Sequence, residues 1–168
     1  RKAKCVVQMT LTTYDEELCR IVEPNVCTTR RRFEVLKTMQ ENGIPTVVWL
    51  SPILPYINDT MENIQGILEY CAQAGVYGII CFGMGMTLRQ GDREYYYAAL
   101  DRHFPGLREK YHRRYGYAYD IQSDRAEELM QYFHAFCAEH SIVSDWGQLF
   151  EYLHEFPENK GYEQLSLF

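Results

Sequence analysis

The sequence contains 168 residues, which is enough for one domain with a single buried core. Hydrophobic residues make up 46% of it and charged residues 24%, a composition typical of a folded globular protein. The longest apolar runs, at 47–50 and 79–82, are far shorter than the roughly 20 residues of a membrane helix, so we expect no membrane partner. The net charge of −6 is uneven: residues 102–119 carry five basic groups and one acidic group, whereas residues 120–168 carry two and ten.

The first half of the chain predicts three buried strands that alternate with helices. Residues 5–11, "IPTVVWLSPI" and "YGIICFG" are apolar, β-branched runs, and each is typical of a buried strand. Between them, "TTRRRFEVLKTMQENG" predicts a helix that ends at Gly43, and apolar residues at 64, 67, 68 and 71 predict another, capped by Asn58, Asp59 or Thr60 and closed by Gly75. Alternation of this kind predicts an α/β architecture with about three parallel strands.

Beyond Gly85 the pattern predicts helices only. "GDREYYYAALDRHF" and "LREKYHRRYG" are the first two, and a third begins near Ser123 or Asp124. Asp145 caps a fourth, in which the core stripe consists of Trp146, Leu149, Phe150 and Leu153. We therefore divide the chain into βα units at 1–90, a helical region at 91–157 and a tail at 158–168. A sheet of three parallel strands is small, so the chain resembles the back half of a larger parallel structure.

The six cysteines include no C-x-x-C pair, and several lie inside predicted strands or helices. We expect reduced, buried thiols in a cytoplasmic protein. The histidines show no H-E-x-x-H spacing, and we expect no metal site.

Ligands of parallel α/β folds bind at the carboxyl ends of the strands, so these ends hold the candidate site. The candidates are Thr10, Thr12 and Thr13 after the first strand, Ser51 with Pro52 and Pro55 after the second, and Gly83, Met84 and Gly85 after the third. Hydroxyls can bind polar ligand groups, and glycines allow close backbone approach. Each also has an ordinary explanation, because threonine favours strands and proline ends them.

A spaced set of motifs in residues 5–85 resembles a known family. The set comprises the threonines at 10–13, Glu23-Pro24, an arginine at 31 or 32, Gly43-Ile44-Pro45, the element from Pro52 to Pro55, and Asn58-Asp59. In this order it resembles the second half of the radical S-adenosylmethionine barrel of proteins related to spore photoproduct lyase, often called DNA repair photolyases. "YAALDRHFPGL" resembles the same family more loosely.

The resemblance implies the C-terminal portion of a (β/α)6 partial barrel of the TIM type. In the family, a [4Fe-4S] cluster cleaves S-adenosylmethionine to a radical, and three cysteines of a C-x-x-x-C-x-x-C loop hold the cluster. That loop does not occur in this sequence, so the resemblance implies an inactive fragment whose parent protein includes the missing N-terminal half of the barrel. By position, the cofactor-binding residues would be Thr10, Thr12, Ser51, Gly83, Met84 and Gly85.

The basic stretch "RHFPGLREKYHRRYGYAY" is a candidate DNA contact. Arg108, Lys110, Arg113 and Arg114 would bind phosphates, and the tyrosines are available for stacking on bases. The alternative is that the tyrosines pack the helices together and the charges form a solvated face. The acidic segment that follows would repel phosphates.

The chain ends in "QLSLF", which resembles the short motif by which bacterial polymerases and repair proteins bind the sliding clamp. Gln164 would fill a polar subsite, and Leu165, Leu167 and Phe168 would enter an apolar groove. The alternative is that these side chains cover an apolar patch of their own domain. Two rivals to the family interpretation also remain: a non-enzymatic module that binds DNA or the clamp, and a complete small α/β enzyme of unrelated chemistry.

Overall fold

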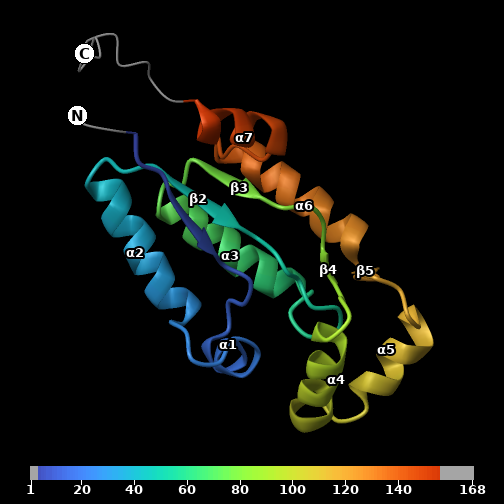
Figure 1. Ribbon diagram of the computed structural model, residues 1–168. Helices are drawn as coiled ribbons and strands as arrows, with labels where there is room; N and C mark the ends of the chain where they lie inside the picture. Colours follow the sequence, from blue (N-terminus) through green and yellow to red (C-terminus); the bar gives the residue numbers. More distant parts are fainter. Residues whose placement is uncertain (1–3, 156–168) are drawn as a thin grey trace, which may run out of the picture.

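A computed structural model describes residues 4–155 as a mixed α/β protein built on a three-stranded parallel sheet (Figure 1). Strands β1 (Val7–Thr10), β2 (Thr46–Trp49) and β3 (Gly78–Ile80) lie in chain order in the sheet. Val7 pairs with Thr46, and Val47 pairs with Gly78. The three predicted strands and their parallel pairing are thus confirmed.

Helices α1 (Glu16–Val22) and α2 (Thr29–Glu41) connect β1 to β2, and α3 (Met61–Gln73) connects β2 to β3. The predicted helix ends are confirmed at Gly43 and Gly75, whose φ angles of 68° and 59° favour glycine. Among the predicted caps of α3, Thr60 is the N-cap, because its side chain accepts a hydrogen bond from the Asn63 amide. Helix α1 was not among the predicted elements.

The second half of the described chain is not purely helical, which corrects the prediction. Strands β4 (Gly85–Thr87) and β5 (Asp120–Gln122) form an antiparallel pair on either side of α4 (Asp92–His103) and α5 (Leu107–Tyr115). The predicted third and fourth helices are present as α6 (Ala126–Glu139) and α7 (Trp146–His154). Asp145 caps α7 as predicted, but Trp146 is 59% exposed and does not belong to the core stripe.

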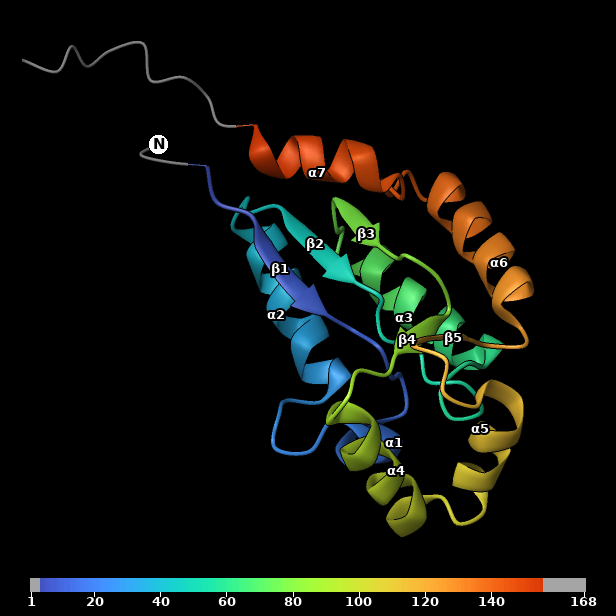
Figure 2. The same ribbon diagram turned by 45° about the vertical axis from the view of Figure 1, so that its right-hand side comes forward.

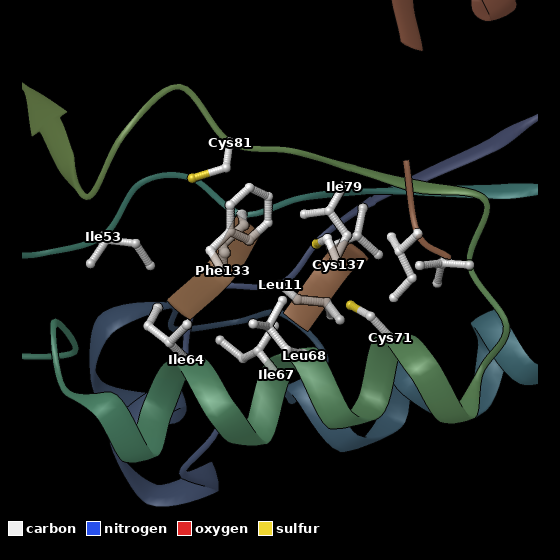
Figure 3. Packing of buried hydrophobic residues seen from close by; sticks show 14 of the residues in the cluster. Leu11, Ile53, Ile64, Ile67, Leu68, Cys71, Ile79, Cys81, Phe133 and Cys137 are labelled. Atoms are coloured by element: carbon white, nitrogen blue, oxygen red, sulfur yellow. The ribbon is translucent and has the colours of Figure 1, made fainter. Parts of the chain in front are cut away.

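The two faces of the sheet are covered by different helices (Figures 1 and 2). On one face, the main core joins Val48 and Ile79 of the strands to buried residues of α2, α3 and α6 (Figure 3). On the other face, α7 packs Leu149 against Val47 and Ile80.

A third apolar cluster, here called the tyrosine cluster, is separate from both. It consists of Leu88, Tyr97, Leu100, Tyr111 and Ile121, from α4, α5, β5 and the residue after β4. Therefore α6 and α7 belong with the sheet, and α4 and α5 form a lobe of their own.

Among the described residues 4–155, one edge of the parallel sheet is unpaired. At the β3 edge, Val143 forms a parallel bridge with Gly78, with hydrogen bonds to Tyr77 and Ile79. At the opposite edge, no strand of residues 4–155 pairs with β1. The backbone groups on the outer side of β1 are therefore available to a further strand.

Candidate functional site

The carboxyl ends of the three parallel strands carry two groups of polar residues. One is a buried network around the loop after β1, and the other is an open pocket between β2, β3, β4 and β5. Of the predicted cofactor residues, Thr10 and Thr12 lie at the network, Ser51, Gly83 and Gly85 line the pocket, and Met84 lies in the main core.

The buried network, here called the threonine–asparagine network, fixes the loop after β1. Thr12 and Thr13 are 4% and 0% exposed, and Asn58 donates to the Thr12 carbonyl at 3.0 Å and to the Thr13 hydroxyl at 3.1 Å. Asn63 also donates to the Thr12 carbonyl, at 2.9 Å, and accepts from the Tyr14 amide at 2.6 Å. The loop thus obtains its hydrogen bonds from two asparagine side chains at the start of α3 and just before it.

An ion pair extends this network towards α2. The Thr12 hydroxyl donates to Glu23 at 2.8 Å, and Glu23 pairs with Arg32 at 2.7 Å; the Arg32 side chain is only 11% exposed. Arg32 also donates to the Thr10 carbonyl at 3.0 Å. Of the two arginines considered from the sequence, Arg32 is therefore the one at the strand end, while Arg31 pairs with Glu34 on the surface. The Thr12 hydroxyl is engaged within the protein.

The second group is the strand-end pocket, a cavity of 440 Å³. It brings together four predicted candidates, Ser51, Pro52, Gly83 and Gly85, with residues that the sequence did not indicate. The full lining is Ser51, Pro52, Phe82, Gly83, Gly85, Met86, Thr87, Asp120 and Gln122. The hydroxyl of Ser51 makes no hydrogen bond to any residue of 4–155, so it is available to a ligand.

The backbone structure partly explains why glycine occupies positions 83 and 85 of the pocket. A Cβ on Gly85 would lie 2.1 Å from the Ile121 carbonyl oxygen, so the pairing of β4 with β5 requires glycine there. Gly83 has a φ of 145°, and a Cβ would lie 3.0 Å from Gln122 Oε1. Met84, between them, is fully buried in the main core, and its carbonyl accepts from the Ser123 amide at 2.8 Å.

Asp120 and Gln122 were missed because β5 is three residues long and far from β4 in sequence. The Gln122 side-chain amide donates to Asp120 at 3.2 Å, and this carboxylate and amide form one wall of the pocket. Thr10 is exposed at the end of β1, outside the pocket lining. The pocket can therefore offer hydroxyl, carboxylate and amide groups beside the exposed ring of Phe82.

The cysteines of residues 4–155 do not fit an iron–sulfur cluster. The buried thiols that the sequence predicted are found at Cys19, Cys71, Cys81 and Cys137, whereas Cys5 and Cys27 are exposed, and none of the six stands in a C-x-x-x-C-x-x-C loop. Within this part of the chain, no group of three or more His, Cys, Asp or Glu side chains is arranged to hold a metal ion.

Three of the four predicted DNA-binding side chains on α5 have partners within the protein. Arg108 pairs with Asp101 at 2.6 Å, and Arg114 pairs with Asp124 at 2.7 Å. The ammonium of Lys110 lies 3.5 Å from the centre of the Tyr56 ring.

Asp124 stays ionised beside these cations. Hydrogen bonds from Tyr56 and then Arg114 lower the pKa of its carboxyl group. Within residues 4–155, Arg113 makes no ion pair. It is thus the predicted cation that is most available to a phosphate. The predicted clamp-binding residues, Gln164, Leu165, Leu167 and Phe168, lie outside the described residues.

Comparisons with known proteins give relatives without a described activity. Over 109 residues, or 65% of the chain, it is 30% identical to uncharacterized proteins of Mycobacterium bovis and Mycobacterium tuberculosis. Over 93 residues it is 28% identical to an uncharacterized protein of Acidianus two-tailed virus. These matches span about a third of each relative's length (32% and 31%). No family model and no solved structure matches the chain. Among residues 4–155, no helix is long and apolar enough to cross a membrane.

Proposed function

We propose that this chain is the C-terminal part of a radical S-adenosylmethionine lyase-like protein related to spore photoproduct lyase. In this proposal, β1, β2 and β3 are the last strands of a (β/α)6 partial barrel. The observation that carries the proposal is the sheet itself: three parallel strands in chain order, with helices between them and an open edge at β1. A preceding strand of a barrel would pair at that edge.

The strand-end pocket is the proposed contribution of this chain to the cofactor site. It lies at the carboxyl ends of β2 and β3, where ligands of parallel α/β folds bind. Ser51 would donate or accept a hydrogen bond, and Gly83 leaves the backbone accessible beside it. Thr12 would act indirectly, by fixing the loop through Glu23. The cluster ligands would come from the missing N-terminal half, because the cysteines of the described residues do not fit them.

The test is the full-length protein, produced with its preceding segment under anaerobic conditions. We expect an iron–sulfur absorption spectrum and reductive cleavage of S-adenosylmethionine. Ser51→Ala should weaken binding of S-adenosylmethionine, whereas Ser144→Ala, at a half-buried serine outside the strand-end pocket, should not. A preceding segment without a C-x-x-x-C-x-x-C loop, or a start codon directly before Arg1, would refute the proposal.

A second proposed function is binding to a bacterial sliding clamp through the C-terminal motif. Its support is the sequence at 164–168, a glutamine followed by leucines and a terminal phenylalanine. Calorimetry with a purified clamp should show micromolar binding by the whole chain and none by a version that ends at Glu163. Equal binding by both chains would refute this role of the motif.

We also propose that α5 contacts DNA. The ion pairs of Arg108 and Arg114 leave Arg113 as the main candidate for a phosphate contact. Because Arg108 and Arg114 already pair with carboxylates, Arg113→Ala should reduce salt-sensitive DNA binding more than Arg108→Ala does. A non-enzymatic DNA-binding or clamp-binding module is the alternative to the lyase-like protein. It would show this binding without any cleavage of S-adenosylmethionine by the full-length protein.

A further inference from the structure

A second cavity, separate from the proposed cofactor site, collects sulfur and imidazole side chains. It has a volume of 430 Å³ and is here called the α6–α7 cavity, because it lies between the residue after β3, helix α6 and the start of α7. Its lining comprises Cys81, Phe82, Met130, His134, Ser144, Asp145 and Trp146. Asp145 caps α7, whereas Cys81, Met130, His134 and Ser144 take no part in the strand-end pocket.

Two sulfur atoms in this cavity lie at a separation that suits shared coordination. Cys81 Sγ is 3.7 Å from Met130 Sδ. Two metal–sulfur bonds of about 2.3 Å would span this separation at an angle of about 110°, which is close to tetrahedral. Cys81 is 6% exposed and belongs to the main core. Its sulfur points away from Cys71 and Cys137 (Figure 3). Its thiol contacts Met130 Sδ and the Gly83 carbonyl oxygen, both at 3.7 Å.

A third ligand of suitable chemistry lines the same cavity. Met130 and His134 are four residues apart on α6, so their side chains lie on the same face of the helix. His134 is exposed, whereas Met130 is half-buried, so the imidazole would lie at the open end and the sulfur atoms at the inner end. A cavity of this size between them leaves room for an ion to enter from solvent.

We propose that Cys81, Met130 and His134 form a binding site for a soft monovalent metal ion of the Cu(I) type. Thiolate and thioether ligands select such ions over the harder divalent cations, and imidazole suits copper as well. Binding would replace the S–H bond of Cys81 by a sulfur–metal bond, the proton would leave to solvent, and the metal would keep its oxidation state. The site is independent of the proposed lyase function, because it shares only Phe82 with the strand-end pocket.

Silver(I) is the first probe, because it is a soft monovalent ion that does not change oxidation state during the titration. The chain should carry Cys5→Ser and Cys27→Ser, since these two exposed thiols would bind silver themselves. We expect one equivalent of silver, detected by calorimetry and by a change in tryptophan fluorescence from Trp146, which lines the cavity. Anaerobic competition with a chromophoric chelator then measures the affinity for Cu(I).

Methionine variants distinguish silver bound at the proposed site from silver bound by a cysteine thiol alone. Met130→Leu conserves the side-chain volume, and it should weaken silver binding at least tenfold and abolish the fluorescence change. Met39→Leu is the matched control, because Met39 is also half-buried on a helix, α2, that contributes no residue to the cavity lining. His134→Gln should weaken binding less than Met130→Leu does. No bound silver, or equal affinity in Met130→Leu and Met39→Leu with both variants folded by circular dichroism, would overturn the proposal.

Discussion

Replacing Asn58 by alanine tests whether the threonine–asparagine network holds the loops at the strand ends. Asn58 is 1% exposed, and its side-chain oxygen accepts from the Leu54 amide at 2.5 Å. Its side-chain nitrogen donates to the loop after β1, at the Thr12 carbonyl and the Thr13 hydroxyl. The substitution therefore removes three hydrogen bonds at once.

The expected magnitude depends on which partners stay unsatisfied. The Thr12 carbonyl still accepts from Asn63, but the Leu54 amide makes no other hydrogen bond within residues 4–155. An orphaned buried donor costs roughly 1–3 kcal/mol, and the lost contacts of the side chain add to this. We expect Asn58→Ala to lower the free energy of unfolding by about 2–4 kcal/mol.

Urea unfolding followed by circular dichroism measures this difference. With a slope of about 2 kcal/mol per molar urea, the midpoint should fall by about 1–2 M. Asn42→Ala is the matched control: the Asn42 side chain also donates to a backbone carbonyl, that of Thr38, but it is exposed, and the change should stay within about 0.5 kcal/mol. An equally small effect of Asn58→Ala would show that this network does not fix the loops.

Two further predictions concern packing and thiol exposure. Gly66→Ala should destabilise the protein although alanine favours helices, because its Cβ would lie 2.4 Å from the Tyr14 ring. Gly147→Ala should cost less in thermal unfolding, because its nearest contact is one side-chain oxygen of Asp145, at 3.1 Å. A chromogenic thiol reagent at neutral pH should react quickly with the two exposed cysteines, Cys5 and Cys27, and with the four buried ones only after denaturation. Rapid reaction of more than two thiols would contradict the burial described here.

The parts of the fold that the sequence predicts are those with long, regular patterns. The strands β1 to β3 are continuous apolar runs, and α3 repeats apolar residues at helical spacing, so both could be recognised without a structure. Strand β5 could not, because Asp120, Ile121 and Gln122 show neither a long apolar run nor a nearby partner. Its pairing with β4 is a long-range contact, and local sequence carries no signal for it.

The candidate site is likewise predictable only where a regular sequence pattern positions its residues. Ser51 and Gly83 could be found because parallel strands bring their carboxyl ends to one edge of the sheet. The roles of Asn58 and Asn63 could not, because a polar residue before or early in a helix predicts a cap, and only the fold shows that both side chains point at the loop after β1. Helix α1 did carry a signal, since Asp15 caps a first turn that contains Glu16 and Glu17.

The separateness of the tyrosine cluster has a consequence for how the molecule opens. Proteins open locally in cooperative units that often coincide with a structural motif, and amide hydrogen exchange reports the free energy of each opening. The lobe of α4 and α5 contacts the segment between β2 and α3, where Tyr111 donates to the Pro55 carbonyl at 2.6 Å and Tyr56 packs against the tyrosine cluster. Met86, Thr87 and Asp120 of the strand-end pocket belong to β4 and β5, which pack with this lobe. We therefore expect the backbone amides of β4 and β5, on this wall of the pocket, to exchange their hydrogens faster than those of β1 to β3.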